Sequence, residues 1–277
     1  MDDLYGVIGD PIAHSMSPAM HNAAFKDAGI QASYGRLHVS PGELPDAIRG
    51  IRALGLRGIN VTVPHKTAVI PLLDEVDPLA SSVGAVNTIV NRNGKLIGYN
   101  TDGLGYVEGL KKVLKGELSS KAILIIGAGG AAKAIYYTLA SLGVRKIDLT
   151  NRSEQKAIDM IESCSFAVES DYCTLSEAGL NLQQYDVVIQ TTSIGMFPKV
   201  EESPLKIGAV KNGAVFSDII YNPIRTSFLK QAQQNGAIIQ NGMDMFIYQG
   251  ALAFRKWTGI IPNTELMKKV VLKQLGG

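Results

Sequence analysis

The stretch "AILIIGAGGAAKAIYYTLASLG" (residues 122–143) passes from a continuous apolar run through a glycine-rich turn into a helical pattern. A strand that is apolar at every position is typical of a parallel sheet buried on both faces. Gly127, Gly129 and Ala132 fill a G-x-G-x-x-A pattern where this strand meets the helix. The first glycine permits a tight turn, the second lets the backbone approach a pyrophosphate, and the third position requires a small residue. The stretch therefore predicts a dinucleotide-binding strand, turn and helix.

Further short apolar runs follow at helix-length intervals, which is the rhythm of a doubly wound sheet. The predicted strands after the glycine turn are residues 146–150, 186–192, 214–220 and 237–240. A helical pattern that begins at residue 103 precedes the whole set. We therefore predict a doubly wound, Rossmann-type α/β domain over residues 103–240.

The end of the second predicted strand indicates which dinucleotide is bound. Proteins that bind NAD place an Asp or Glu there, about twenty residues after the glycines, to hold the ribose 2′-hydroxyl. Here Asp148 lies inside the strand, and its end is followed by polar and basic residues: Asn151, Arg152, Ser153 and Lys156. The guanidinium of Arg152 is suited to pair with a 2′-phosphate in bidentate geometry. The pattern favours NADP; a solvated arginine, or the adenosyl cofactor of a methyltransferase, is the alternative.

The first hundred residues also alternate strand and helix signals, but with a different pairing. Strands are predicted at residues 4–10, 33–39 and 56–63, and helices at 17–29 and 42–55. Within residues 85–100, two alternating runs flank Asn93–Gly94, which is the strongest short-range signal for a hairpin. The chain ends in two predicted helices with no strand after them, and we expect them to pack on this first part. We therefore predict a second α/β domain, for substrate binding and catalysis, from residues 1–102 and 241–277.

The segment "NVTVPHKTA" (residues 60–68) leaves a predicted strand in an unusual way. Asn60 and Thr62 are two residues apart and so share one face of the strand, and Lys66 follows just past its end. Other polar residues follow neighbouring strands: Ser15, Ser17, Asn87 and Asp102. Strand ends in α/β sheets converge on a common crevice, so we expect these hydroxyls, amides, ammonium and carboxylate to meet there. The set has no metal-ligand spacing and predicts a site for a small polyhydroxylated molecule.

Each of these residues also has a purely structural interpretation. Ser17 can cap the helix at 17–29, with Pro18 in its first helical position. Asp102 can cap the helix that follows it, and Lys66 can be a surface lysine. Three of the four histidines lack mutual ligand spacing, and we interpret them as packing or polar-loop residues: His14, His21 and His65.

Composition excludes several other classes of protein. The 277 residues are 46 % apolar and 19 % charged, which allows a sizeable core and argues against disorder. A net charge of +2 is too small to indicate a nucleic-acid or membrane-surface partner. The two cysteines, Cys164 and Cys173, have no paired ligand pattern and are expected to be free thiols. With neither a signal peptide nor an apolar run near the ~20 residues of a membrane span, we predict a cytoplasmic protein.

Taken together, these motifs resemble the shikimate dehydrogenase family over nearly the whole chain. The matching segments are "HSMSPAMHN" (14–22), "NVTVPHK" (60–66), "GAVNTIV" (84–90), "GYNTDG" (98–103), "GAGGAAKA" (127–134), "NRSEQKA" (151–157), "TTSIGM" (191–196), "DIIYNPIRT" (218–226) and "NGMDMFIYQ" (241–249). Nine motifs in order are far more specific than any one of them. Two positions depart from the family pattern, Gln190 where a shorter residue such as Asn is more usual and Lys133 where Arg is frequent.

The resemblance implies a set of site residues. The shikimate pocket would be lined by Ser15, Ser17, Asn60, Thr62, Lys66, Asn87, Asp102, Tyr221 and Gln249. NADP would be contacted by Gly127, Ala128, Gly129, Gly130, Ala131, Asn151, Arg152, Lys156, Thr191, Ile219 and Gly242, together with Ser153 at the same strand end. Tyr221 and Gln249 follow from the resemblance alone, because a loop tyrosine and a glutamine in an apolar helix look structural.

The activity that the resemblance implies is the reversible, NADPH-dependent reduction of 3-dehydroshikimate to shikimate, a step in aromatic amino-acid biosynthesis. Lys66 would act as the acid in reduction and as the base in oxidation, and Asp102 would share its proton or orient it. A quinate/shikimate dehydrogenase that uses NAD is one alternative, against which the serine pair and Asn151–Arg152 argue. A non-catalytic nucleotide sensor is another, and the presence of both Lys66 and Asp102 argues against it. A monomer and a homodimer are both compatible with the sequence.

Overall fold

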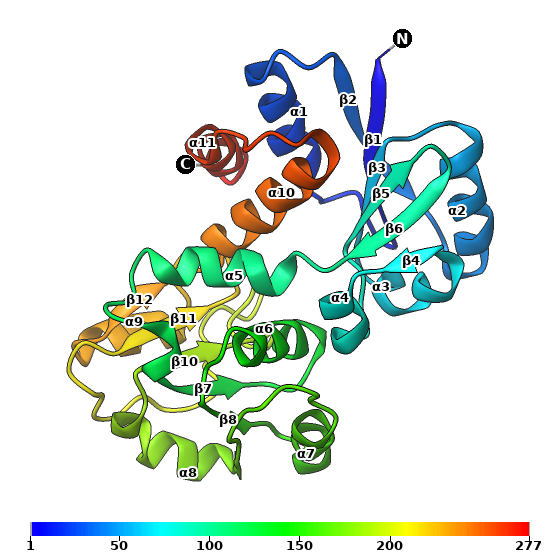
Figure 1. Cartoon of the computed structure of the whole chain (residues 1–277). Coiled ribbons are helices and arrows are strands. Elements are labelled where there is room, and N and C mark those ends of the chain that lie inside the picture. The colour runs from blue at the N-terminus through cyan, green and yellow to red at the C-terminus, as the bar shows by residue number, and fades with distance from the viewer. Residues whose placement is uncertain (1, 277) are drawn as a thin grey trace. The chain divides into compact units, whose positions relative to one another are not determined.

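The computed structural model describes residues 2–276, which divide into two compact units (Figure 1). The first unit runs to Gly105 and resumes at Ile247, and the second is Tyr106–Phe246. Each break falls within a helix, α5 (Asp102–Lys111) and α10 (Met243–Thr258). The predicted class, a two-domain α/β protein with a doubly wound sheet, is confirmed.

The first unit is built on a mixed, six-stranded sheet of order β2-β1-β3-β5-β6-β4. Its strands are β1 (Asp3–Gly9), β2 (Ala32–His38), β3 (Gly58–Val61), β4 (Glu75–Val76), β5 (Thr88–Arg92) and β6 (Lys95–Tyr99). β1 runs parallel to β2 and β3, whereas β5 is antiparallel to both β3 and β6. The hairpin predicted at Asn93–Gly94 is present, with positive φ angles of 53° and 91° that suit a two-residue turn.

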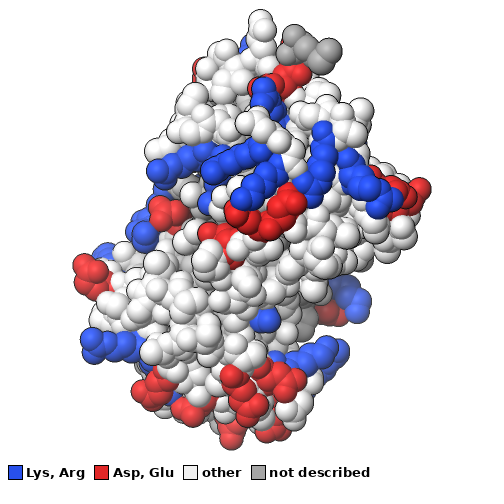
Figure 2. Space-filling model, turned by 45° about the vertical axis from the view of Figure 1, so that its right-hand side comes forward, with Lys and Arg blue, Asp and Glu red and all other residues white. Residues whose placement is uncertain are grey.

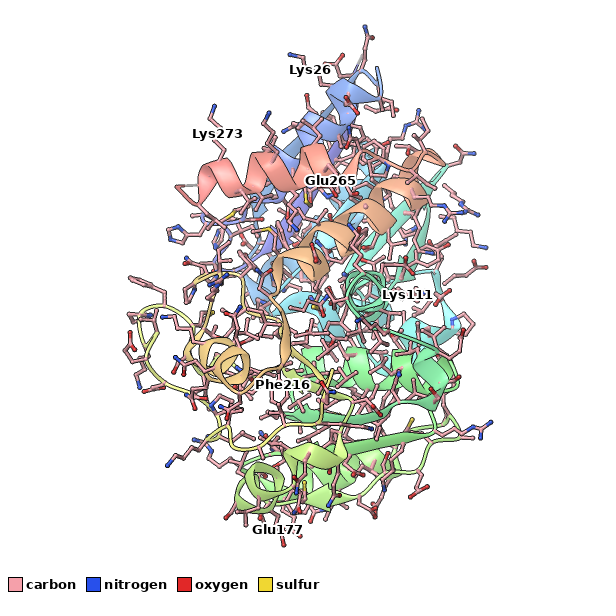
Figure 3. All side chains as sticks on the ribbon, turned by 90° about the vertical axis from the view of Figure 1, so that its left-hand side faces the viewer. Lys26, Lys111, Glu177, Phe216, Glu265 and Lys273 are labelled. Carbon is pink, nitrogen blue, oxygen red and sulfur yellow. The ribbon has the colours of Figure 1, made fainter. Side chains whose placement is uncertain are left out.

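Helices cover both faces of this sheet. They are α1 (Ser17–Asp27), α2 (Leu44–Ala53), α3 (His65–Ala68), α4 (Pro78–Val83) and α11 (Thr264–Gln274), with most of α10. Three-residue 3₁₀ turns lie at Pro41–Glu43 and Ile70–Leu72. Figure 1 shows α1, α10 and α11 on one side of the sheet and α2 on the other. α11 packs on α1, and Lys26 and Lys273 extend from these helices away from the ribbon (Figure 3).

The second unit contains a six-stranded sheet that is parallel throughout, with the order β12-β11-β10-β7-β8-β9. Its strands are β7 (Ala122–Ile126), β8 (Lys146–Thr150), β9 (Tyr172–Cys173), β10 (Val187–Gln190), β11 (Val215–Asp218) and β12 (Ile238–Gln240). The chain starts at the centre with β7, moves outward to β9, then returns to β10 on the other side. This reversal defines the topological switch point at which doubly wound sheets bind nucleotides.

Helices and short turns connect these strands. They are α6 (Gly130–Ser141), α7 (Glu154–Glu162), α8 (Leu175–Leu180) and α9 (Ser227–Gln234), with 3₁₀ turns at Leu118–Ser120 and Leu182–Gln184. α8 and α9 share a buried core with β7, β10 and β11, in which the rings of Phe216 and Phe228 lie 5.7 Å apart. None of the helices within residues 2–276 is both long and apolar enough to cross a membrane.

The surface carries charges of both signs. Figure 2 shows Lys and Arg side chains gathered on the first unit with Asp and Glu among them. Ion pairs such as Arg57–Asp3 and Arg52–Asp74 account for some of this mixing. Over residues 2–276, no group of His, Cys, Asp and Glu side chains is arranged to hold a metal ion.

An aromatic cluster fills the space between the first sheet and helices α1 and α10. The ring of His21 stacks on Tyr34 at 4.5 Å and lies 5.2 Å from Trp257. Neither ring nitrogen of His21 has a hydrogen-bond partner among the described residues. Complete burial lowers the pKa of His21 to about 3, because the charged form cannot be solvated there. The prediction that His21 is a packing residue agrees with this environment.

We predict that His21 makes the protein sensitive to acid. Between pH 6.5 and 3 the unfolded chain binds a proton at this ring and the folded chain does not, so this contribution to stability is present above pH 6.5 and is lost as the pH falls. At about 1.4 kcal/mol per pH unit, the loss from this one group at pH 5 is about 2 kcal/mol. Urea unfolding, followed by the fluorescence of Trp257, measures the free energy of unfolding at pH 7.5 and pH 5. The difference between the two should be about 2 kcal/mol smaller in His21→Phe than in the wild type.

His14→Phe serves as the control, because His14 is exposed in a loop of the same unit. It should keep the pH dependence of the wild type. An unchanged pH dependence in His21→Phe would show that His21 is not buried in its neutral form.

Candidate active site

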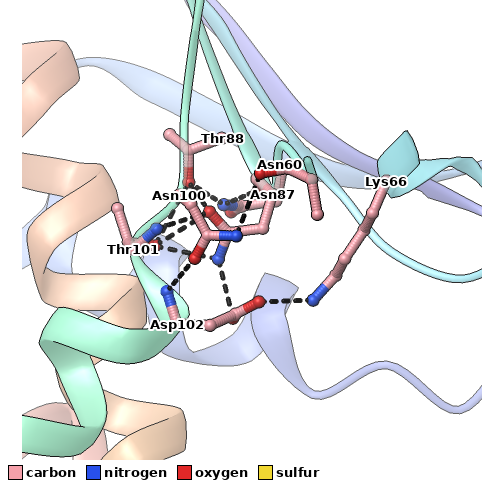
Figure 4. A network of polar contacts seen from close by, with 8 residues as sticks. Asn60, Lys66, Asn87, Thr88, Asn100, Thr101 and Asp102 are labelled. Atoms are coloured by element: carbon pink, nitrogen blue, oxygen red, sulfur yellow. Dashed lines mark hydrogen bonds and ion pairs between the residues drawn. The ribbon is translucent and has the colours of Figure 1, made fainter. Parts of the chain in front are cut away.

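The centre of the candidate site is an ion pair between two chain segments. Lys66 Nζ lies 2.6 Å from Asp102 Oδ2 (Figure 4). The side chain of Lys66 is 31 % exposed and that of Asp102 is 13 % exposed. The pair is therefore partly shielded from water, yet the ammonium remains accessible to a small molecule.

The unusual segment after β3 explains how Lys66 is placed. Pro64 cannot donate a hydrogen bond to the sheet, and α3 begins directly after it. The next residue, His65, is fully buried and donates from Nε2 to the carbonyl of Val39 at 2.7 Å. Because this hydrogen bond anchors His65 in the core, the side chain of the next residue, Lys66, extends from α3 toward Asp102.

Hydrogen bonds hold both the carboxylate and the backbone N–H of Asp102. Asn87 Nδ2 donates to Asp102 Oδ1 at 2.8 Å, and Asn100 Oδ1 accepts from the Asp102 N–H at 3.0 Å. Asn87 Oδ1 accepts from the backbone N–H of Thr101 at 2.8 Å and from Thr88 Oγ1 at 3.0 Å. These contacts, drawn in Figure 4, fix the carboxylate at the start of α5.

Asn60 belongs to the same polar network. Its Oδ1 accepts from the hydroxyl of Tyr34 at 2.7 Å, and its Nδ2 donates to the Asn87 carbonyl and to Thr88 Oγ1, both at 3.1 Å. Asn60 is 7 % exposed and Asn87 is 2 % exposed. The structure therefore brings Asn60, Lys66, Asn87 and Asp102 together, and it adds Tyr34 and Thr88, which sequence reasoning missed.

The predicted cap at Ser17 is wrong. The N-cap of α1 is Met16, which already has near-helical dihedrals of −90° and −4°, so Ser17 is the first helical residue. An N-cap side chain needs extended dihedrals to reach the following N–H groups, and Ser17 lacks them. Instead, Ser15 Oγ accepts from the backbone N–H of Ser17 at 3.3 Å. The hydroxyl of Ser17 therefore does not cap the helix, and this structural explanation no longer competes with a role in ligand binding.

The remaining predicted substrate residues lie in different parts of the fold. Thr62 is half-buried and donates its N–H to the carbonyl of Ile8, which extends β3 by one residue. Tyr221, in the second unit, stacks on Phe246 at 5.1 Å. The backbone of Gln249, on α10 in the first unit, packs so closely on Gly105 that a Cβ on Gly105 would lie 2.4 Å from the backbone nitrogen of Gln249. A lone glycine in a sequence does not reveal this close approach.

The glycine turn of the second unit has the geometry that a dinucleotide requires. Gly127 has a φ of +114°, and a Cβ there would lie 2.5 Å from Thr191 Oγ1. Thr191 Oγ1 donates to the carbonyl of Ile126 at 2.7 Å, which holds this threonine over the turn. Gly127 therefore cannot be replaced without moving the end of β10.

Open space lies beyond the turn. Gly129 and Gly130 are exposed, and a Cβ on either would meet no heavy atom of the described chain within 4 Å. Gly129 is the N-cap of α6, whose first turn is Gly-Ala-Ala-Lys, so no acidic residue of that turn competes for its N-terminal N–H groups. A helix N-terminus of this kind binds phosphate. The residues Gly127, Ala128, Gly129, Gly130 and Ala131 thus fit a pyrophosphate.

The end of β8 carries positive charge. Asp148 is buried within the strand, where it accepts from the Asp171 N–H and the Tyr185 hydroxyl, both at 3.0 Å. It is therefore committed to the fold, as the prediction that it lies inside the strand implies. Arg152 and Lys156 are exposed, and neither forms an ion pair with another residue in the range 2–276. This strand end suits a phosphate rather than a free ribose hydroxyl.

Two loops complete this side of the second unit. A Cβ on Gly242 would lie 2.0 Å from the carbonyl oxygen of Ile219, so only glycine allows the two segments to touch. Asp218 accepts from the Ile220 N–H and from Thr226 Oγ1, and burial raises its pKa to about 6. Gln190, which departs from the family pattern, donates to the carbonyl of Ile194 at 2.9 Å and so holds the loop after β10.

A phosphate-binding turn at the switch point of one sheet, and an ammonium–carboxylate pair for proton transfer beside the other, are the parts of a nicotinamide-dependent oxidoreductase. Three family models match the chain. The shikimate dehydrogenase substrate binding domain matches residues 7–89, shikimate/quinate 5-dehydrogenase matches 109–219, and the shikimate 5′-dehydrogenase C-terminal domain matches 242–272. The chain belongs to the shikimate dehydrogenase family.

Individual relatives agree with this assignment. A shikimate dehydrogenase (NADP⁺) of Geobacillus sp. (strain WCH70) is 55 % identical over 277 residues, which is all of both chains. A crystal structure of a shikimate dehydrogenase in complex with NADP⁺ is similar with a TM-score of 0.90 and 41 % identity, covering 99 % of this chain and 96 % of that one. The Thermus thermophilus enzyme, in complex with NADP(H) and shikimate, has a TM-score of 0.87 and 33 % identity, with 98 % and 99 % covered.

Proposed function

We propose that this chain catalyses the reversible, NADPH-dependent reduction of 3-dehydroshikimate to shikimate, a step in aromatic amino-acid biosynthesis. The observation that carries the proposal is the 2.6 Å contact between Lys66 Nζ and Asp102 Oδ2 in a member of this family. Relatives of the same length are shikimate dehydrogenases that use NADP⁺. The small-molecule substrate is therefore shikimate or 3-dehydroshikimate.

Reduction of a ketone needs a hydride at carbon and a proton at oxygen, and bound NADPH supplies the hydride. Lys66 supplies the proton. Its ammonium has three N–H groups, of which one points to Asp102, so two remain for the carbonyl oxygen of the substrate. In the oxidation direction Lys66 takes the proton from the substrate hydroxyl, and Asp102 keeps the amine aimed at it. The positive charge of Lys66 also stabilises the negative charge that develops on oxygen.

The other polar side chains of the site bind and orient the substrate. We assign this role to Ser15, Ser17, Asn60, Thr62, Asn87, Tyr221 and Gln249. They offer hydroxyl and amide groups, which match a ring that carries several hydroxyls. Asn60 and Asn87 already donate all their side-chain N–H groups to protein. Asn60 Oδ1 keeps one lone pair that can accept from the substrate, whereas Asn87 Oδ1 already accepts from Thr88 and Thr101, so Asn87 acts through the Asp102 carboxylate that it holds.

NADP binds to the second unit. Residues 127–131 and the N-terminus of α6 hold the pyrophosphate, and Asn151, Arg152, Ser153 and Lys156 hold the 2′-phosphate. Thr191, Ile219 and Gly242 complete the cofactor contacts. We assign substrate binding and catalysis to residues 1–102 with 241–277, and cofactor binding to residues 103–240.

The proposed roles all come from one chain, so a monomer suffices for the function and a homodimer is compatible with it. Cys164 and Cys173 are free thiols, as expected of a protein of the reducing cytoplasm, where we place the enzyme. We propose no nucleic-acid or membrane partner.

A steady-state assay that crosses shikimate and quinate with NADP⁺ and NAD⁺ tests the proposed function. Absorbance of the reduced nicotinamide should give the highest kcat/KM for shikimate with NADP⁺. A highest value for quinate with NAD⁺ would identify a quinate dehydrogenase. Binding of NADP⁺ without turnover of any pair would identify a nucleotide sensor.

Lys66→Ala should lower kcat by roughly 10²–10⁴-fold, the usual worth of a positioned acid or base, with a much smaller change in the KM for shikimate. Asp102→Asn should also be slow. If the two residues act as a unit, the double mutant should lose clearly less than the product of the single losses. Lys26→Ala, on the outer side of α1, is the control and should retain wild-type kinetics. A normal kcat with only a raised KM would make Lys66 a binding residue.

Arg152→Ala should raise the KM for NADP⁺ by about one to two orders of magnitude, because a charge-assisted contact worth roughly 1.5–3 kcal/mol is removed. The KM for NAD⁺, which has no 2′-phosphate, should hardly change. Arg152→Lys should recover only part of the loss, since lysine keeps the charge without the planar fork.

Arg145→Ala is the matched control, because Arg145 is an exposed arginine of the same unit outside the cofactor contacts. Raising the salt concentration should weaken NADP⁺ binding in the wild type more than in Arg152→Ala. Equal losses for NADP⁺ and NAD⁺ would show that Arg152 supports the loop or stacks on the adenine.

A further inference from the structure

We propose that Tyr34 is a positioning residue for catalysis, because its hydroxyl starts a one-directional chain of hydrogen bonds that ends on the carboxylate of Asp102. This chain, which we call the relay, consists of Tyr34, Asn60, Thr88, Asn87 and Asp102. The inference rests on the proposed role of the Lys66–Asp102 pair and extends it to residues that do not touch the pair.

Four hydrogen bonds make up the relay. The Tyr34 hydroxyl donates to Asn60 Oδ1 at 2.7 Å, and Asn60 Nδ2 donates to Thr88 Oγ1 at 3.1 Å. Thr88 Oγ1 then donates to Asn87 Oδ1 at 3.0 Å, and Asn87 Nδ2 donates to Asp102 Oδ1 at 2.8 Å. Figure 4 shows the last three links, of which the final one, from Asn87, reaches the carboxylate of Asp102, and Lys66 contacts the other carboxylate oxygen.

Two backbone groups determine the direction of the relay. The carbonyl of Asn87 can only accept, so the Asn60 atom that faces it at 3.1 Å must be the amide nitrogen. The N–H of Thr101 can only donate, so the Asn87 atom that faces it at 2.8 Å must be the amide oxygen. With both amides oriented in this way, Tyr34 must donate to Asn60, and the proton of Thr88 is free to point to Asn87.

The start of the relay is itself rigidly held. Tyr34 is 4 % exposed, and its ring stacks on His21 of α1. Asn22 of α1 binds both backbone groups of Tyr34, accepting from its N–H and donating to its carbonyl, each at 2.9 Å.

Aligned hydrogen bonds in a buried site polarise one another, and each donor strengthens the next. The relay therefore presents to Asp102 Oδ1 a stronger donor than an isolated amide would be. It also leaves Oδ2 as the oxygen that contacts Lys66. Loss of the Tyr34 hydroxyl leaves Asn60 Oδ1 without its donor, and the amide cannot rotate to compensate because its nitrogen must still face the Asn87 carbonyl.

Three variants test the relay. Tyr34→Phe removes only the first donor, and Thr88→Val removes the middle hydroxyl while keeping the shape of the side chain. Each should lower kcat/KM for shikimate by about tenfold, the effect of leaving one buried polar group unpaired, and should leave the KM for NADP⁺ unchanged. Thr88→Ser keeps the hydroxyl and should recover most of the loss. Tyr5→Phe, in the same aromatic cluster but outside the relay, should retain wild-type kinetics.

A double-mutant cycle separates the relay from a general loss of structure. If Tyr34 acts through Asp102, the cost of Tyr34→Phe should largely disappear in the Asp102→Asn background. Multiplicative losses in the cycle, wild-type kcat/KM in both Tyr34→Phe and Thr88→Val, or equal losses in Thr88→Ser and Thr88→Val would each overturn the proposal. Absence of wild-type turnover of shikimate with NADP⁺ would contradict the proposed function. Normal wild-type turnover together with unaffected relay variants would contradict only the relay.

Discussion

Asn87 is the side chain on which the geometry of the candidate site depends. It lies one residue before β5, is almost fully buried, and uses both ends of its amide to join the start of β5 to Thr101 and Asp102. Loss of these partners would leave the buried amide unpaired and would destabilise the fold by the free energy of several hydrogen bonds. The chain before α5 therefore cannot move without breaking this set, and Asp102 is presented to Lys66 at a fixed position. The same residue receives the hydrogen bond of Thr88, so the interior of the sheet and the reactive surface share one polar network.

In the second unit, backbone groups rather than side chains form the candidate site for the pyrophosphate. A pyrophosphate needs close approach and N–H donors, and bulky side chains would prevent both. Gly127 meets the first need with a left-handed φ and with Thr191 packed against it, whereas Gly129 and Gly130 leave space open at the start of α6. At the other end of the site, Gly242 lets two loops touch at the backbone of Ile219. We propose that selectivity for the 2′-phosphate of NADP rests on side chains, chiefly that of Arg152 just after the end of β8.

Features that arise from local chemistry could be predicted from the sequence. The hairpin at Asn93–Gly94, the glycine turn at Gly127 and the long helices all follow from residues that are neighbours in the chain. The short elements α3, α4, β4 and β9 were not predicted, because two to six residues carry no usable periodicity. Tyr34 and Thr88 were missed for a related reason: their partner Asn60 lies 26 and 28 residues away in sequence, and nothing in either position alone indicates the contact. The cap at Ser17 failed because the helix already includes this residue, with Met16 before it near the helical conformation.

The distribution of polarity within the first unit is consistent with these roles. On one face of its sheet, Tyr5, His21, Phe25 and Trp257 make an aromatic core that accepts a histidine only in its neutral form. At the ends of β3 and β5, the interior instead contains amides and hydroxyls, each paired with another. Apolar residues of similar volume would avoid the cost of burying these groups, so the network contributes orientation rather than stability. Its last members, Asp102 and Lys66, are the ones that remain partly exposed, at 13 % and 31 %. In the proposed function this pair exchanges a proton with the substrate, so it has to be accessible on one side, and the buried amides behind it hold the other side in place.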